Sequence, residues 1–332
     1  MVRPWTPTHT LVVACVSAVA IGGGIGLVTA PRARPPAAPR ASAPASVRSA
    51  ASPAPAAINP LTGGQVSDHE VLAVKVENIA AARPQVGLNS ADIIVAAEVE
   101  GAQTRLIAIY HTRFPKTLGP VRSARSTDVQ LLPMFGEPGL VYSGANRQVQ
   151  RKIDAASIVA IQRETRDNRR VAPHNVFVDL AAIADSEQAG RAEPIGWTFA
   201  ASDGRVADAP KARSVTSRVG SDIFAFAYGR RGYTVHWNGQ TYADGDTRAT
   251  LKVDNVVVLN VRNHPDGNVD VRGAASVESD TVGRGAMALY RDGAKLTGYW
   301  SRERESGPMT FTTASGDPLN LTPGSTWVSL EG

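Results

Sequence analysis

The sequence predicts an α+β protein, with a mixed α/β domain first and a mostly-β domain after it. From residue 58 to about 205, short apolar runs alternate with helix-forming segments. From about residue 210 to 332, short strand-forming runs follow one another, broken by Gly, Asn and Asp turns, and none has the helical period. We therefore place the two domains at 58–205 and 210–332, behind an N-terminal segment at 1–30 and a linker at 31–57.

Strands of the first domain are predicted where β-branched and other apolar residues run together between turn residues. They cover residues 71–76, 92–98, 104–111, 139–144 and 158–161. Helices are predicted where apolar residues recur at helical spacing or where capping residues open a segment. They cover residues 127–133, 146–157 and 179–190.

The second domain should be barrel-like or sandwich-like, because its short strands are regularly spaced. Its tryptophans allow two interpretations. Trp237, Trp300 and Trp327 could line a sugar-binding face, but buried aromatic residues are the commoner case, so we expect them in the core.

The charge distribution argues against nucleic acid as a partner. The chain carries 35 Lys and Arg against 30 Asp and Glu. Five of the arginines and no acidic residue lie in residues 1–58, which leaves a neutral folded part with 30 charges of each sign. A neutral domain has no electrostatic drive toward a polyanion.

The N-terminal segment predicts export or membrane attachment. Residues 11–30 carry no charge and are just long enough for a membrane span. Val28-Thr29-Ala30 is typical of a signal-peptidase site, whereas Cys15 after Val12-Val13-Ala14 resembles a lipoprotein box in an unusual place. A cleaved signal, a retained anchor and lipidation at Cys15 therefore all stay open.

The linker and the folded part fit an extracytoplasmic location. Residues 31–57 are a Pro/Ala/Ser tract that cannot build a core and would act as a tether. The basic residues after the apolar segment favour the opposite orientation, but that rule is weak for cleaved signals. No cysteine follows Cys15, so the folded part needs no disulfide in an oxidising compartment.

The stretch that begins at Glu98 concentrates carboxylates, arginines and hydroxyl residues. Gly101-Ala102 between two strand-forming runs predicts a two-residue turn. In that register residue 98 pairs with 105, which puts Glu98 opposite Arg105 and Glu100 on the same face.

The arginines that follow predict an anion site. Arg122 and Arg125 precede a predicted helix start at Thr127, where Gln130 completes a capping-box pattern. Guanidinium groups beside free N–H groups of a helix start suit a carboxylate or a phosphate. The predicted ligand-binding residues are Arg105, Arg122, Ser123, Arg125, Thr127, His174 and Asn175.

Catalysis is the alternative, with two candidate arrangements. Glu98 and Glu100 could be the carboxylate pair of a wall hydrolase, because two residues apart on one strand they share a face. Ser143 ends a strand and could be activated by His174, although Val-Tyr-Ser-Gly-Ala is not the G-x-S-x-G elbow. The structural interpretations are a salt-bridged hairpin and a turn serine.

We expect neither a metal nor a cofactor. The six histidines stand far apart, no H-E-x-x-H occurs, and the single cysteine lies in the apolar segment. No G-x-x-x-x-G-K-[ST] loop is present for a nucleotide.

A series of motifs in fixed order resembles the YerB-like lipoproteins, a two-domain family without an established biochemical activity. The motifs are NPLTG at 59–63, RPQVGL at 83–88, EVEGAQTR at 98–105, GPVRSAR at 119–125, PHNVF at 173–177, GYWSR at 298–302 and SGDPLNLTPGSTWVSL at 315–330. The resemblance covers nearly all of the chain after residue 58 and implies a cell-envelope protein. Members are lipid-anchored through an N-terminal cysteine, and the position of Cys15 departs from that pattern.

We therefore predict an extracytoplasmic envelope protein, tethered to the membrane or secreted. Its expected partner is an anionic cell-wall component or another envelope protein, and the expected role is binding without chemistry. A wall hydrolase is the runner-up, and a scaffold in a multiprotein complex is a third class.

Overall fold

A computed structural model describes residues 58–230, 232–270 and 273–332. The predicted anchor at 1–30 with Cys15 and the predicted linker at 31–57 lie outside the described residues. Among the residues that are described, no helix combines the length and the apolar character needed to cross a membrane.

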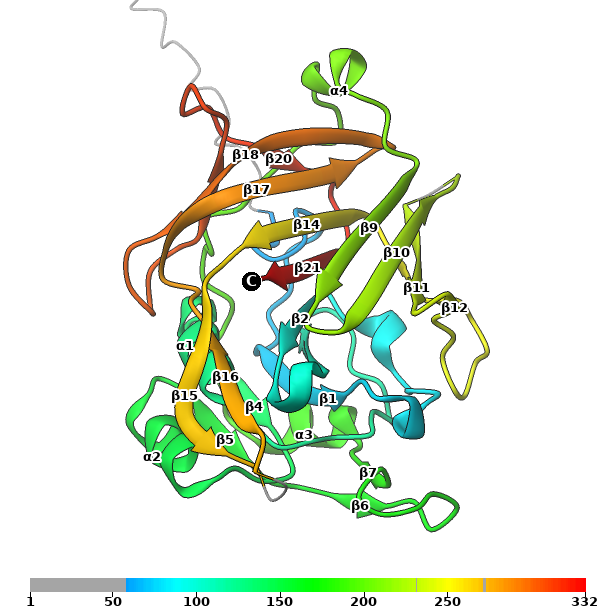
Figure 1. Ribbon diagram of the computed structural model, residues 1–332, viewed down its shortest axis with the longest axis vertical. Coiled ribbons are helices and arrows are strands. Elements are labelled where there is room, and N and C mark those ends of the chain that lie inside the picture. The colour runs from blue at the N-terminus through cyan, green and yellow to red at the C-terminus, as the bar shows by residue number, and fades with distance from the viewer. Residues whose placement is uncertain (1–57, 231, 271–272) are drawn as a thin grey trace, which may run out of the picture. The chain divides into compact units, whose positions relative to one another are not determined.

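The main feature is a ten-stranded mixed sheet to which both halves of the chain contribute (Figure 1). The N-terminal half supplies β1 (Leu72–Glu77), β2 (Ile93–Glu98), β3 (Thr104–Tyr110), β4 (Gly139–Val141) and β5 (Val159–Ile161). The C-terminal half supplies β14 (Asn255–Asn260), β17 (Gly283–Arg291), β18 (Ala294–Arg302), β19 (Thr310–Thr312) and β21 (Thr326–Glu331). The order across the sheet is β19-β18-β17-β14-β21-β2-β3-β1-β4-β5.

The last strand of the chain joins the two halves. β21 lies between β14 and β2 and runs parallel to both, with Val328 level with Val257 on one side and Val95 on the other. Figure 1 shows β21 in this central place. The sheet is therefore continuous from the N-terminal to the C-terminal half.

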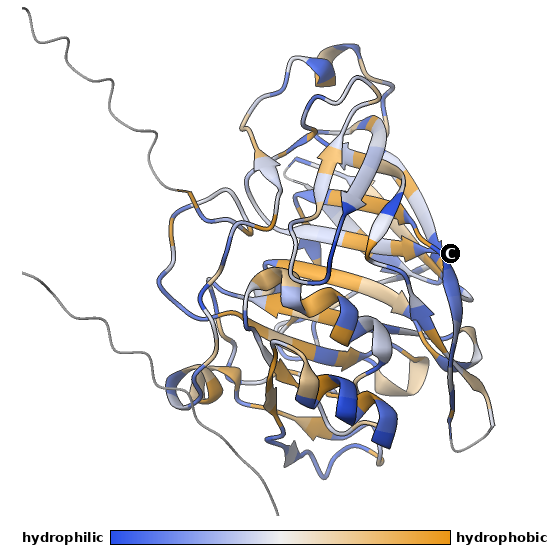
Figure 2. Ribbon diagram, turned by 90° about the vertical axis from the view of Figure 1, so that its left-hand side faces the viewer, coloured by the Kyte–Doolittle hydropathy of each residue, from blue (hydrophilic) through white to orange (hydrophobic). Residues whose placement is uncertain are grey.

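Both faces are buried in the middle of this sheet, which explains why β1, β2, β3, β14 and β21 are mainly apolar (Figure 2). The strands β17 and β18 also have exposed positions. One face packs with α1 (Ser126–Leu131) and α2 (Arg147–Ala155), whose Val149 and Ile153 are buried at the helical spacing the sequence predicts. The other face packs with α3 (Leu180–Ser186) and with a second sheet. A one-turn helix, α4 (Arg205–Asp208), contacts β18 and packs Val206 against this core.

The second sheet is all antiparallel and belongs to the C-terminal half. It contains β9 (Ser214–Val219), β10 (Asp222–Tyr228), β11 (Tyr233–Trp237), β12 (Gln240–Thr241) and β13 (Lys252–Val253). Phe224 and Phe226 of β10 pack on Trp327 of β21, with ring centroids 4.9 and 5.6 Å apart. The mixed first half and the mostly-β second half confirm the predicted fold class, and all three tryptophans discussed above are buried.

Three two-stranded pairs complete the described fold. They are β6 (Thr165–Arg166) with β7 (Val176–Phe177), β8 (Thr198–Phe199) with β20 (Asn320–Leu321), and β15 (Asn263–Val269) with β16 (Ala275–Ser279). The β15–β16 hairpin lies alongside α1 (Figure 1).

Candidate functional site

The loop between β2 and β3 does not have the predicted register. Glu98 pairs with Thr104, and Ala97 pairs with Arg105, so five residues connect the strands instead of two. Gly101 and Ala102 both have positive φ, 65° and 54°, within a short 3-10 turn. The prediction that Glu98 faces Arg105 is wrong, because a one-residue slip exchanges the two faces of a strand.

Glu100 forms the ion pairs that were expected of Glu98. Arg125 donates to both of its carboxylate oxygens, through Nε to Oε1 and through Nη2 to Oε2 at 3.0 Å. Arg105 Nη2 lies 3.9 Å from Glu100 Oε2. All three side chains are buried, so this cluster is shielded from solvent. Glu98 instead accepts a hydrogen bond from Asn263 Nδ2 at 2.9 Å.

Burial and charge shift the pKa values of this cluster. Burial by itself would raise the pKa of Glu100, but hydrogen bonds and charge from Arg125, with the charge of Arg105, outweigh it and lower that pKa. Burial, followed by repulsion from Arg125, lowers the pKa of Arg105 to about 10. At neutral pH the cluster therefore holds two guanidinium ions and one carboxylate.

A second carboxylate, that of Glu77, contacts the side chains of Arg122 and His174. Its Oε1 lies 2.9 Å from Arg122 Nε, and its Oε2 lies 2.8 Å from His174 Nδ1. Glu77 is 3% exposed and ends β1. Glu77 is not among the residues predicted from the sequence, although a charged residue that closes an apolar strand is the kind that needs a partner.

These residues line one cleft of about 680 Å³, which we call the arginine cleft. It brings together six of the predicted residues: Glu100, Arg105, Arg122, Ser123, Arg125 and His174. Four others do not line it: Glu98, Thr127, Ser143 and Asn175.

The helix start does not provide the predicted anion site. α1 begins at Ser126, and the N–H of Arg125 already donates to the Asp128 carboxylate at 2.7 Å. Thr127 points elsewhere, since its Oγ1 accepts a hydrogen bond from the N–H of Ser279 at 2.9 Å. An internal carboxylate therefore occupies the place predicted for a ligand, and the prediction for Thr127 is corrected.

Ser143 and Asn175 make backbone hydrogen bonds near the cleft. The N–H of Ser143 donates to the carbonyl oxygen of Arg122 at 3.2 Å. The carbonyl oxygen of Asn175 accepts from the N–H of Asp167 at 2.8 Å, within the β6–β7 turn. Ser143 does not line the cleft that His174 lines, and no hydrogen bond joins the two side chains among the described residues, so the predicted nucleophile and base pair is not formed.

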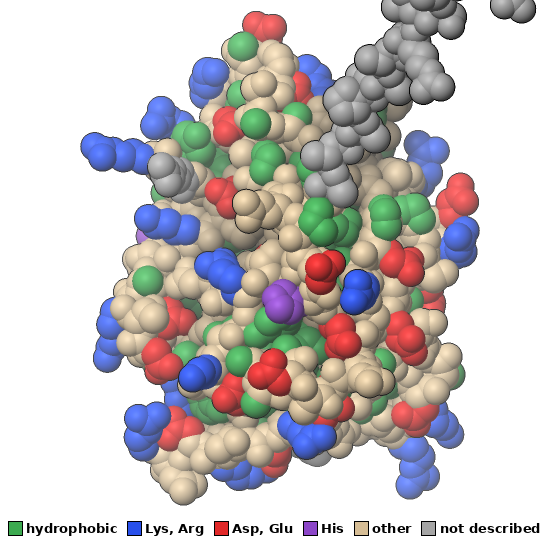
Figure 3. All heavy atoms as spheres, turned by 180° about the vertical axis from the view of Figure 1, so that it is seen from behind, with side chains coloured by type: hydrophobic (Ala, Val, Ile, Leu, Met, Phe, Trp, Pro, Cys, Tyr) green, Lys and Arg blue, Asp and Glu red, His purple; other side chains and the backbone are tan. Residues whose placement is uncertain are grey.

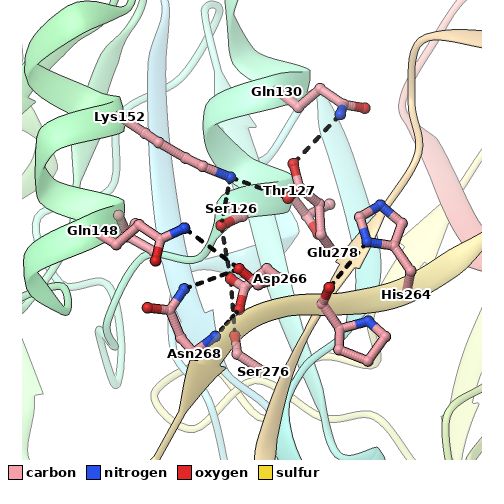
Figure 4. Close-up of polar contacts among 12 residues, drawn as sticks. Ser126, Thr127, Gln130, Gln148, Lys152, His264, Asp266, Asn268, Ser276 and Glu278 are labelled. Atoms are coloured by element: carbon pink, nitrogen blue, oxygen red, sulfur yellow. Dashed lines mark hydrogen bonds and ion pairs between the residues drawn. The ribbon is translucent and has the colours of Figure 1, made fainter.

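The β15–β16 hairpin supplies one wall of the arginine cleft through Val269, Asp270 and Ala274. Its stem is fastened to the helices by polar contacts (Figure 4). Ser126 donates to Asp266 Oδ2 at 2.7 Å, and Lys152 Nζ lies 3.1 Å from both Ser126 Oγ and Glu278 Oε2. Figure 4 shows these side chains converging from α1, α2 and the hairpin, so this wall is held in place.

Arg122 has unused donor capacity at this cleft. It is 22% exposed, whereas Arg105 and Arg125 are about 10% exposed. Arg105 also donates to the carbonyl oxygen of Ser123 at 3.1 Å, and Arg125 donates to that of Ala124 at 2.8 Å. Within the described residues, Nη1 and Nη2 of Arg122 donate no hydrogen bond, so both are available to a ligand.

Other ligand classes receive no support from this geometry. Over the described part of the chain, no group of three His, Cys, Asp or Glu side chains could hold a metal ion. Basic and acidic side chains are interspersed on the face drawn in Figure 3, without an extended patch of one sign. A long polyanion would require such a patch.

Comparison with known proteins identifies the family. The sequence profile described as "Protein of unknown function (DUF3048) N-terminal domain" matches residues 60–193, and the corresponding C-terminal profile matches residues 214–328. The chain belongs to the DUF3048 family.

A relative in this family is the Bacillus subtilis (strain 168) protein named "Putative lipoprotein YerB", which is 26% identical over 294 residues. The match covers 82% of this chain and 85% of that protein. The crystal structure of YerB from Bacillus subtilis superposes with a TM-score of 0.69 at 22% identity, covering 82% of this chain and 96% of that one. The resemblance to the YerB-like lipoproteins is thereby confirmed, and this chain and YerB share one fold.

Proposed function

We propose that this DUF3048 protein acts in the cell envelope, outside the cytoplasmic membrane, and binds an anionic group in the arginine cleft. The relative's name as a lipoprotein and the apolar segment at residues 11–30 support that location. The anion would belong to a wall component or to a partner protein at the wall.

One observation carries the binding proposal: among the described residues, the terminal amino groups of Arg122 donate no hydrogen bond at the cleft, beside the buried positive charges of Arg105 and Arg125. A planar guanidinium with two free N–H groups matches a carboxylate or a phosphate bidentately. The Glu77 carboxylate lies 2.9 Å from Nε of Arg122 as an ion pair and so limits where the guanidinium can lie, although within the described residues this Nε makes no hydrogen bond. Preorganised donors of this kind lose little entropy on binding.

Retention on purified cell wall tests this proposal. Removing the bidentate contact in Arg122→Gln should weaken retention roughly 10-fold to 100-fold, since a charged hydrogen bond contributes about 1.5–3 kcal/mol. Arg191→Gln is the matched control, because Arg191 is 77% exposed and does not line the cleft. Equal retention of the two variants would remove the basis of the proposal.

A hydrolase is the second candidate, and one contact favours it. His174 Nδ1 is bonded to Glu77 at 2.8 Å, the arrangement in which a carboxylate orients an imidazole as a general base. His174 would then take a proton from water beside the arginines. Turnover of purified wall material should be lost in both Glu77→Gln and His174→Gln; activity that survives both changes would exclude this pair.

A further inference from the structure

A second cleft adjoins the arginine cleft. It encloses about 910 Å³, and His174 lines both clefts. We call it the β6–β7 cleft, because Thr165, Asp167 and Phe177 contribute to it from that pair of strands and the turn between them. The two spaces therefore meet at one side chain.

The walls of the β6–β7 cleft are fastened together. Arg170 donates from Nη1 to the carbonyl oxygen of Ala82 at 3.1 Å and from Nη2 to that of Pro84 at 2.7 Å. Its guanidinium carbon also lies 5.0 Å from the centroid of the Phe177 ring. These contacts join the β6–β7 turn to the segment after β1, so the cleft is formed before any ligand arrives.

The two clefts differ in chemistry. Arg169 Nε lies 2.9 Å and Arg170 Nε 3.9 Å from the carboxylate of Asp167, and Arg83 donates to the side-chain oxygens of Gln85 and Asn78, so all three arginines of the second cleft already have partners. Pro84, Val86 and Phe177 give it an apolar lining. It therefore suits an uncharged part of a ligand, whereas the arginine cleft suits an anion.

Exposed valines border both clefts. Val171, at the β6–β7 cleft, is 80% exposed, and Val269, at the arginine cleft, is 64% exposed. Each cleft also has the volume of a site for an organic ligand, which is about 300–1,000 Å³.

We infer that the two clefts form one groove for an extended peptide, whose carboxylate binds Arg122 and whose uncharged residues pass His174 into the β6–β7 cleft. This inference rests on the proposed anion-binding function. A peptide combines the required features, because it carries a carboxylate, small apolar side chains and a backbone that can follow a bent groove. The fixed position of His174 between the clefts makes it the point that such a chain must cross.

Isothermal titration calorimetry on the purified protein tests the groove. The probes are acetyl-alanine, acetyl-tetraalanine with a free carboxylate, the amide of acetyl-tetraalanine, and inorganic phosphate. Acetyl-tetraalanine should bind at least tenfold more tightly than acetyl-alanine. The amide of acetyl-tetraalanine should bind at least tenfold more weakly than the free acid. Val171→Asp should remove the advantage of the longer acid, whereas Val66→Asp, an exposed valine outside both clefts, should preserve it.

The outcomes separate the two claims. Equal affinities for the short and long acids, or an unchanged advantage in Val171→Asp, would overturn the groove and leave the anion site standing. Phosphate binding more tightly than acetyl-tetraalanine would overturn the peptide as the ligand class. Affinity for the acids that is unaffected by Arg122→Gln would overturn the anion site and the groove with it.

Discussion

Lys75 Nζ lies 2.6 Å from Asp128 Oδ1, and neither side chain is accessible to solvent. The same two residues also bond to the backbone of the segment that carries the cleft's arginines. The carbonyl oxygen of Lys75 accepts from the N–H of Arg122, and the carboxylate of Asp128 accepts from the N–H of Arg125. One buried ion pair therefore anchors both ends of the segment that carries the cleft's arginines.

Lys75→Met should destabilise the protein by about 3–5 kcal/mol, because it leaves the Asp128 carboxylate buried without its cation. Adding Asp128→Asn removes that charge and keeps an acceptor for the N–H of Arg125. The double variant should therefore be at least about 1 kcal/mol more stable than Lys75→Met alone. Urea denaturation measures both; simple additivity of the two single changes would contradict the coupling.

Glu100→Gln should cost about 3 kcal/mol at neutral pH, because it leaves Arg105 and Arg125 without their carboxylate. The folded-state pKa of Glu100 is depressed below 4.5, so its contribution is complete above that pH and is lost as pH falls through the folded pKa. The difference in unfolding free energy between wild type and variant should therefore shrink in acid. Glu303→Gln, at an exposed carboxylate, should match the wild type throughout, and a pH-independent gap for Glu100→Gln would refute the assignment.

Arg122→Lys should separate charge from geometry. Lysine keeps the positive charge but cannot make the bidentate contact, so wall retention should fall to a level between wild type and Arg122→Gln. The folding stability of both variants should change less than that of Arg125→Gln, because Arg125 is more deeply buried and donates to both oxygens of Glu100. Retention of Arg122→Lys equal to that of the wild type would indicate that charge alone is recognised.

Trp327→Ala should destabilise the whole folded part by about 3–5 kcal/mol, because the ring is completely buried against Phe224 and Phe226. Since β21 pairs with β2 and β14, both halves should unfold in a single transition. The number of unfolding transitions can be measured by circular dichroism together with hydrogen exchange in β1 and β17. Two separate transitions would show that the halves are energetically independent.

Local pattern accounts for much of the architecture. The apolar run before Glu77 predicts β1, and the spacing of Val149 and Ile153 predicts α2. Short strand-forming runs broken by turn residues in the second half predict strands at β10 and β11. These elements follow from the sequence because each depends on its own periodicity and turn residues.

The register of the β2–β3 hairpin shows where local pattern stops. Gly101-Ala102 predicts a two-residue turn, but Val99 and Gln103 bond to each other and lengthen the loop. In the observed register Glu98 no longer faces Arg105, whereas Glu100 lies against Arg125 and Arg105. In this register Glu98 accepts a hydrogen bond from Asn263, which lies 165 residues away in the sequence, so no local signal reports the contact.

The sequence by itself determined the family, the fold class and the arginines of the cleft, because motifs, periodicity and charge are local properties. Only the tertiary structure decided that Glu77 and His174, 97 residues apart, share a hydrogen bond, and that Asp128 rather than a ligand occupies the start of α1. It also decided that the two halves share one sheet through β21. These features depend on the long-range pairing of strands, which brings distant charges into a buried space where each must find a partner.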